Sequence, residues 1–434
     1  MSTRSLLPYA TLLIAAGLAA GGAPLQAQPA CAEPSFVRPP GSFGGGPGQG
    51  GYSSFYVGGS PMSATVADFD RDGQLDIATA NLGGDSVSVR FGNNNPIDGN
   101  FNQRAGVDIA MPASPGTNGS RPYGITHGLM NNDAFVDLVV VNRNSNTAVV
   151  LLGDGSGSFT QLAPVAVGGG YAYHPALGDF DGDGDLDVAV TQNASNFVRI
   201  LLNDGQGVLS AHPTTLSGIN APIGIVAGDL VGSSAVDLAV VASGSDQIYV
   251  YPGNGNGTFA APTILNAVED AIATPISVQL HDMDNDGRGD LVVAVRVNRA
   301  NGGEPVSPYN RIAIFHSLPG GGFESTPLFI AAGPDMTHAT AADFNRDGTL
   351  DLLGTSAAYA FIGNVVLNSG ARTYDAPIGH DVAGNPFFGV TGDFNKSGYP
   401  DFAIVNQPSN TVTVYINQCA PTDPIFDDGF DGVD

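Results

Sequence analysis

The sequence is poor in lysine, glutamate, cysteine and tryptophan. Its 434 residues include one lysine (Lys396), four glutamates, two cysteines and no tryptophan. Lysine and glutamate fill the exposed faces of most helices, so their scarcity disfavours helical bundles and coiled coils. With 15 basic against 41 acidic side chains the chain offers no basic patch, and we expect no nucleic acid among its partners.

Long apolar runs are missing as well. None reaches the roughly 18 residues that a membrane-spanning helix needs, so we expect no membrane span. The run Leu12 to Ala20 follows Arg4 and precedes Leu25-Gln26-Ala27, which together predict a secretory signal peptide over residues 1–27. We therefore expect a secreted, periplasmic or cell-surface protein. A lipid-anchored Cys31 is a weaker alternative, because residues 28–30 lack the usual aliphatic side chain.

The residues that are abundant are aspartate, glycine and apolar ones. Thirty-seven of the 41 acids are Asp, and 60 Gly with 30 Pro indicate many turns. A hydrophobic share of 42% is enough for a large core and argues against disorder. We divide the chain into a Gly/Pro-rich lead-in (28–51), a folded domain (52–418) and an acidic tail (419–434). Cys31 and Cys419 flank the domain and predict a disulfide after export, with two free thiols as the alternative.

A nine-residue motif recurs seven times along the folded domain. Its copies, numbered here loops 1 to 7, start at residues 68, 129, 179, 229, 282, 343 and 393, which are separated by 61, 50, 50, 53, 61 and 50 residues. Four copies follow the pattern D-x-D/N-x-D-G-x-x-D, and loop 7 carries Ser397 at the fifth position. Loops 2 and 4 are decayed copies. This regularity indicates seven equivalent structural units.

Short apolar runs bounded by Gly and Asn surround each motif and predict about four strands in every unit of roughly 50 residues. A unit of this size matches one blade of a β-propeller. We therefore predict an all-β fold, a seven-bladed β-propeller with four-stranded blades; a linear β-solenoid is the alternative. The last unit lacks a fourth strand after Tyr415, and the segment Tyr52 to Val57 can supply it, so that an N-terminal strand completes the last blade.

The motif has the chemistry of a calcium loop. Aspartate at positions 1, 3, 5 and 9, with a backbone carbonyl at position 7 and a sharp turn at the glycine in position 6, provides hard oxygen ligands that suit Ca²⁺. No histidine or cysteine joins these sets in sequence, which argues against zinc. The EF-hand requires a glutamate at position 12. Here that position holds Thr79, Val190, Val293 and Gly354, so the EF-hand is excluded.

The pattern resembles the FG-GAP or VCBS-type repeat of integrin alpha-chain propellers and many exported bacterial proteins, over about residues 52–418. The resemblance implies that each loop joins the first two strands of a blade and holds Ca²⁺, at about four to five sites. Leu129 in loop 2, and Val231 and Ser233 in loop 4, leave metal binding there open. The implied ligands, including the position-7 carbonyls, are Asp68, Asp70, Asp72, Gln74, Asp76, Asp179, Asp181, Asp183, Asp185, Asp187, Asp282, Asp284, Asp286, Arg288, Asp290, Asp343, Asn345, Asp347, Thr349, Asp351, Asp393, Asn395, Ser397, Tyr399 and Asp401.

No catalytic motif is present, and the seven histidines show no ligand spacing. We expect a monomeric, non-enzymatic binding or adhesion module for a protein or carbohydrate. The alternative is a calcium-dependent enzyme, a polysaccharide lyase or phosphoesterase. The resemblance places the ligand face opposite the calcium loops, where the candidates are Tyr123, Tyr173, His174, His338, Phe387 and Phe388; packing between blades is the other interpretation of these side chains. Arg71, Arg288 and Arg346, within the loops, are expected to face solvent.

Overall fold

The computed structural model describes residues 31, 34–37, 54–93, 101, 105–268, 273–297, 311–333, 335–357 and 362–418. The predicted signal peptide, most of the lead-in, Cys419 and the acidic tail lie outside these residues. No helix in the described part of the chain is long and apolar enough to cross a membrane.

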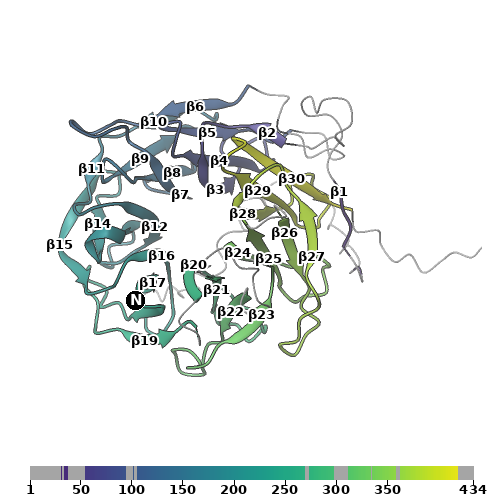
Figure 1. The fold of residues 1–434 in the computed structure, drawn as a ribbon. Helices are drawn as coiled ribbons and strands as arrows, with labels where there is room; N and C mark the ends of the chain where they lie inside the picture. The colour runs from purple at the N-terminus through teal and green to yellow at the C-terminus, as the bar shows by residue number, and fades with distance from the viewer. Residues whose placement is uncertain are drawn as a thin grey trace, which may run out of the picture.

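The described strands form seven antiparallel sheets arranged as blades around a central axis (Figure 1). Blades 1 to 3 contain β3 (Pro61–Ala67), β4 (Asp76–Asn81), β5 (Ser86–Arg90) and β6 (Val107–Ala110); β7 (Pro122–Gly128), β8 (Asp137–Asn142), β9 (Thr147–Gly153), β10 (Phe159–Gln161) and β11 (Val165–Ala166); β12 (Ala172–Gly178), β13 (Asp187–Gln192), β14 (Phe197–Asn203) and β15 (Leu209–Ser217). The predicted seven-bladed, all-β fold is confirmed.

Blades 4 to 7 repeat this order. They contain β16 (Pro222–Gly228), β17 (Asp237–Ala242), β18 (Gln247–Tyr251) and β19 (Thr263–Asn266); β20 (Ala273–His281), β21 (Asp290–Val297), β22 (Arg311–Phe315) and β23 (Leu328–Ala331); β24 (Met336–Ala342), β25 (Asp351–Ser356), β26 (Ile362–Val366) and β27 (Ile378–Asp381); and β28 (Pro386–Gly392), β29 (Asp401–Asn406) and β30 (Thr411–Asn417). One 3₁₀ turn, Asn193–Ser195, is the single helical element described.

The ring is held by packing between blades. The first strands of successive blades contact one another around the axis, and β28 contacts β3 to close the circle. Seven apolar clusters each join two neighbouring blades, so the core is a ring of layers. Second strands such as β8 and β17 are buried along their whole length. Because both of their faces are covered, they are rich in Val, Leu and Ala and do not alternate with polar residues.

Two N-terminal segments complete the last blade. β2 (Ser54–Tyr56) pairs antiparallel with β30, with Phe55 opposite Val412, which confirms the predicted strand. β1 (Phe36–Val37), which was not predicted, pairs with the other end of β30, and the Gln418 N–H donates to the Ser35 carbonyl at 2.7 Å. Cys31 is buried, 4% exposed. Since Cys419 lies outside the described residues, the disulfide stays a prediction.

Candidate metal loops and axial pocket

The nine-residue motifs connect the first and second strands of the blades, as predicted. Loop 1 follows Ala67, the last residue of β3, and its ninth residue, Asp76, is the first residue of β4. In loops 1, 3, 5, 6 and 7 the glycine at position 6 has a positive φ, for example +96° at Gly184. Loops 2 and 4 carry Ala134 and Ser234 there, with ordinary φ. The backbone thus separates five metal-type loops from two others.

Carboxylates converge within three of the five metal-type loops. In loops 1, 3 and 5, one oxygen from each of three aspartates lies within 4.8 Å of the others; the sets are Asp68, Asp70 and Asp76, then Asp179, Asp181 and Asp187, then Asp282, Asp284 and Asp286. Loops 6 and 7 carry Asn345 and Asn395 at position 3. The first carboxylate also folds the loop. Asp68 accepts the N–H of Asp72 at 3.1 Å and that of Gly73 at 2.9 Å.

The aspartate at position 9, a predicted metal ligand, also holds the blade together through backbone hydrogen bonds. Asp76 accepts the N–H of Phe69 at 2.7 Å and that of Gly92 at 2.8 Å, which ties the start of the loop to the end of the third strand. The same pair of hydrogen bonds recurs in all seven blades, at Asp137, Asp187, Asp237, Asp290, Asp351 and Asp401. Each of these carboxylates is completely buried. Loops 2 and 4 therefore keep the aspartate at position 9 although they have lost other ligand positions.

Several loop carboxylates have raised pKa values. Burial, together with the neighbouring carboxylates, raises the pKa of Asp76 and of Asp351 to about 7, against the lowering effect of their backbone hydrogen bonds. The pKa of Asp187 is raised to about 6 for the same reasons. Packed anions that repel one another in this way are stabilised by a bound cation.

The side chains at position 4 of loops 1, 5 and 6 contact the next loop. Arg71 is exposed, as expected, whereas Arg346 is half-buried. Arg71 of loop 1 lies over the Phe135 ring of loop 2, 5.4 Å from its centroid, and Arg346 of loop 6 lies over Tyr399 of loop 7 at 5.5 Å. Asn285 of loop 5 donates to the Gly348 carbonyl of loop 6 at 2.6 Å. Loops 1 and 2 are thus linked to each other, as are loops 5, 6 and 7.

Arg288, at position 7 of loop 5, is 39% exposed, as expected, but it also makes contacts within the blade. Its guanidinium pairs with Asp286 and donates to Ser317 Oγ at 3.2 Å. At each of the five predicted position-7 ligands, including Gln74, Asp185, Thr349 and Tyr399, the backbone N–H donates to the side chain at position 5.

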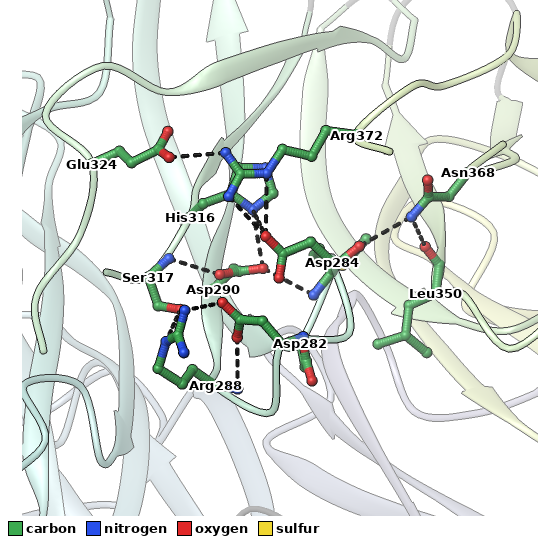
Figure 2. A network of polar contacts seen from close by, with 12 residues as sticks. Asp282, Asp284, Arg288, Asp290, His316, Ser317, Glu324, Leu350, Asn368 and Arg372 are labelled. Atoms are coloured by element: carbon green, nitrogen blue, oxygen red, sulfur yellow. Dashed lines mark hydrogen bonds and ion pairs between the residues drawn. The ribbon is translucent and has the colours of Figure 1, made fainter. Parts of the chain in front are cut away.

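The expectation that no histidine joins the loops is wrong for loop 5. His316, at the end of the third strand of blade 5, is 1% exposed, and its Nδ1 lies 3.2 Å from Asp290 Oδ2 and 3.6 Å from Asp284 Oδ2 (Figure 2). The sequence spacing missed it because 26 residues separate His316 from Asp290. Alignment of the seven units shows the signal: the six equivalent positions hold Phe91, Leu152, Leu202, Pro252, Leu367 and Ile416.

All six predicted ligand-face residues lie at one pocket. Tyr123, Tyr173, His174, His338, Phe387 and Phe388 line it together with Ile223, Ile276, Ser277, Arg296 and Thr337, around a cavity of about 190 Å³. Most of these residues lie near the beginning of the first strands, whereas the metal-type loops follow the ends of the same strands. A seven-residue strand is about 20 Å long, so the pocket opens on the face opposite the loops.

The pocket combines ring faces with polar groups. The rings of Tyr123 and Tyr173 have centroids 4.4 Å apart, and His338 stacks on Phe388 at 3.7 Å. Ser277 Oγ is buried without a hydrogen-bond partner. Although the chain carries 41 acidic side chains, none is among the pocket's eleven lining residues; Arg296, which lines it, pairs with Asp335 at 3.6 Å. The pocket is therefore suited to a group with a flat apolar face.

Comparisons with known proteins agree with this architecture. A family model described as FG-GAP-like repeat matches residues 130–190, 179–240 and 232–293. The sequence matches no curated protein. Similar solved structures include a chain from BBS1N in complex with ARL6DN, at 10% identity and a TM-score of 0.53, covering 85% of this chain and 98% of that one.

Two lyases share the fold. A streptogramin B lyase is 14% identical, with a TM-score of 0.53, over 84% of this chain and 96% of that one. Virginiamycin B lyase from Staphylococcus aureus is 11% identical, with a TM-score of 0.52, over 84% of this chain and 98% of that one. At these identities the likeness concerns the fold alone. FG-GAP-like repeats over residues 130–293, together with seven blades in the described part of the chain, support an FG-GAP repeat β-propeller.

Proposed function

We propose that this chain is an exported, calcium-binding β-propeller that acts as a non-enzymatic binding module for a protein or carbohydrate. The axial pocket carries the proposal. Aromatic side chains from blades 2, 3, 6 and 7 meet there around a cavity that is free of carboxylates. Concave, largely apolar sites with a few polar groups are the usual form of a ligand site.

Calcium belongs to the opposite face. Loops 1, 3, 6 and 7 offer only oxygen ligands and share the left-handed glycine at position 6, and in loops 1 and 3 the carboxylates converge. Burial, with a smaller contribution from neighbouring carboxylates, raises the pKa values of Asp76, Asp187 and Asp351, and a divalent cation would favour their charged forms. In this proposal calcium stabilises the scaffold, and the ligand binds some 20 Å away, so the two activities can be measured separately.

The calcium part is tested on the purified full chain by calorimetric titration and thermal unfolding. We expect a chelator to lower the melting temperature by several degrees and Asp181→Ala to remove one calcium equivalent. Asp133→Ala is the matched control, because loop 2 lacks the metal-type backbone. Equal melting temperatures with calcium and with chelator would contradict this part.

The binding part is tested with a glycan array and a pull-down from secreted material, using calcium-loaded protein. Phe388→Ala should lower the affinity for any ligand that is captured at least tenfold. Tyr249→Ala, on the third strand of blade 4, should leave that affinity unchanged. Negative results in both assays with folded wild-type protein would refute a binding module. Cleavage of an acidic polysaccharide or a phosphoester by the same sample would favour the enzyme alternative. The N-terminal sequence of exported material tests cleavage after Ala27.

A further inference from the structure

Loop 5 differs from the other metal-type loops by a nitrogen ligand. We propose that Asp284, Asp290 and His316 form a mixed nitrogen–oxygen site for a first-row transition ion, with Zn²⁺ as the reference ion. The buried imidazole, its distances to two carboxylates and the charges around them support this site (Figure 2).

The imidazole is directed at the carboxylates. His316 occupies a position that is apolar in the other six blades and is 1% exposed. Its Nδ1 contacts Asp290 and Asp284, while its Nε2 is buried without a hydrogen-bond partner. A buried polar ring costs free energy unless it is paired. Nδ1 is hydrogen-bonded to Asp290 Oδ2 at 3.2 Å, so this edge of the ring is already aimed at a carboxylate. A metal bound at Nδ1 would replace that hydrogen bond and join the imidazole to both carboxylates.

The distances fit a small ion. Zinc bonds of about 2.0–2.2 Å in a tetrahedral arrangement place neighbouring ligand atoms about 3.4 Å apart. Nδ1 of His316 lies 3.2 Å from Asp290 Oδ2 and 3.6 Å from Asp284 Oδ2. Asp284 Oδ1 is buried and accepts no hydrogen bond. Calcium prefers sites made only of oxygen, whereas imidazole with carboxylate suits zinc and its neighbours in the first row.

Arg372 has the role of a positioning residue. Its guanidinium donates to Asp284 Oδ2 at 2.8 and 3.2 Å and to Glu324 Oε1 at 2.8 Å. It adopts φ +61° at a position of the turn that is glycine in four other blades: Gly157, Gly207, Gly257 and Gly321. An arginine in a left-handed conformation is unfavourable, which its hold on Asp284 offsets. Hydrogen bonds of this kind orient the ligands of metal sites.

The charge balance leaves room for a divalent cation. Five carboxylates gather here, those of Asp282, Asp284, Asp286, Asp290 and Glu324, against two guanidinium groups. Arg288 pairs with Asp286, and Arg372 is shared between Asp284 and Glu324. Asp290, fully buried, has no guanidinium partner among the described residues.

The experiment uses the full chain without a histidine tag, stripped of metal and then saturated with calcium to fill the all-oxygen loops. Co²⁺ and Zn²⁺ are titrated in turn. We expect one equivalent of Co²⁺ with the visible absorption of a nitrogen-ligated, low-coordinate site, displaced by Zn²⁺. His316→Gln should weaken Zn²⁺ binding at least tenfold and abolish that spectrum, with calcium binding to the other loops unchanged.

His212→Gln, on the outer strand of blade 3, is the matched control and should bind Zn²⁺ like the wild type. Asp284→Asn is a second variant that tests the site if His316→Gln fails to fold, and it should also lose Zn²⁺ binding. Unchanged Zn²⁺ affinity in either folded variant would overturn the proposal. The proposal would also be overturned if the calcium-loaded wild type bound no transition ion. In that case Arg372 and Arg288 alone would balance the charge of the loop 5 carboxylates.

Discussion

The carboxylate of Asp137 accepts the backbone N–H of Met130 at 2.7 Å, seven residues earlier, and that of Gly153 at 2.8 Å. Loop 2 lacks the metal-type backbone, yet it keeps this buried aspartate. The repetition of these two hydrogen bonds in every blade indicates that the aspartate at position 9 holds the blade together whether or not a metal is bound.

We therefore expect Asp137→Ala to destabilise the chain equally with calcium and with chelator. Two buried N–H groups lose their acceptor, which costs about 2–5 kcal/mol in total. Urea unfolding in both conditions measures the change, and the exposed Asp133→Ala should change stability by less than about 0.5 kcal/mol. If Asp137→Ala lowers the stability only when calcium is present, Asp137 acts as a metal ligand instead.

The second prediction concerns the pH dependence of stability. Burial, with smaller effects of His174 and His281, lowers the pKa of His338 to about 3, and burial lowers that of His174 to about 4. At these two histidines the unfolded chain gains protons below pH ~6.5 that the folded chain does not bind, so their contribution to stability falls as the pH drops. Each such histidine contributes up to about 1.4 kcal/mol per pH unit.

His338→Gln should therefore lose less stability than the wild type between pH 6.5 and pH 4.5, measured by urea unfolding at several pH values with calcium present. His212→Gln, at a partly exposed histidine, is the control variant. Parallel pH profiles for the wild type and His338→Gln would contradict a neutral, buried His338 in the folded chain.

The sequence predicted the features that the repeat itself encodes. The period located the loops and the strands on each side, and the missing fourth strand pointed to Tyr52–Val57, which contains β2. Phe36–Val37 was not predicted, because a two-residue strand shows no periodicity. His316 was missed because its contact with Asp290 depends on the pairing of strands 26 residues apart. The six pocket residues were predicted from their place before the loops, but only closure of the ring brings Tyr123 within 6.2 Å of Phe387, between ring centroids.

Closure of the ring gives a third prediction. β1 pairs with the end of β30, and the Gln418 N–H donates to the carbonyl of Ser35, the residue before β1. Cys31 donates its N–H to the Asn345 carbonyl of loop 6 at 2.7 Å, so the N-terminal segment lies beside the C-terminal end of the domain. We expect a Cys31–Cys419 disulfide in exported protein. Such a bond closes a loop of almost the whole domain and should stabilise it by about 2–4 kcal/mol.

Peptide mapping with and without reduction detects this bond directly. A Cys31→Ser, Cys419→Ser double variant should unfold at lower urea concentration than the wild type, and a reducing agent should lower the stability of the wild type but not of the variant. Two free thiols in freshly exported protein would contradict the prediction.

The last prediction separates backbone strain from ion pairing at Arg372. Its φ of +61° costs roughly 1–2 kcal/mol for a residue with a Cβ, while its pairs with Asp284 and Glu324 are partly exposed and contribute about 0–1 kcal/mol each. Arg372→Gly removes both the strain and the pairs, so the stability of the metal-free chain should stay within about 1 kcal/mol of the wild type. Arg372→Ala keeps the strain and loses the pairs. It should be less stable than Arg372→Gly by about 1 kcal/mol in urea unfolding. An alanine variant as stable as the glycine variant would show that the turn relaxes, and that Arg372 is retained there without a cost in backbone conformation.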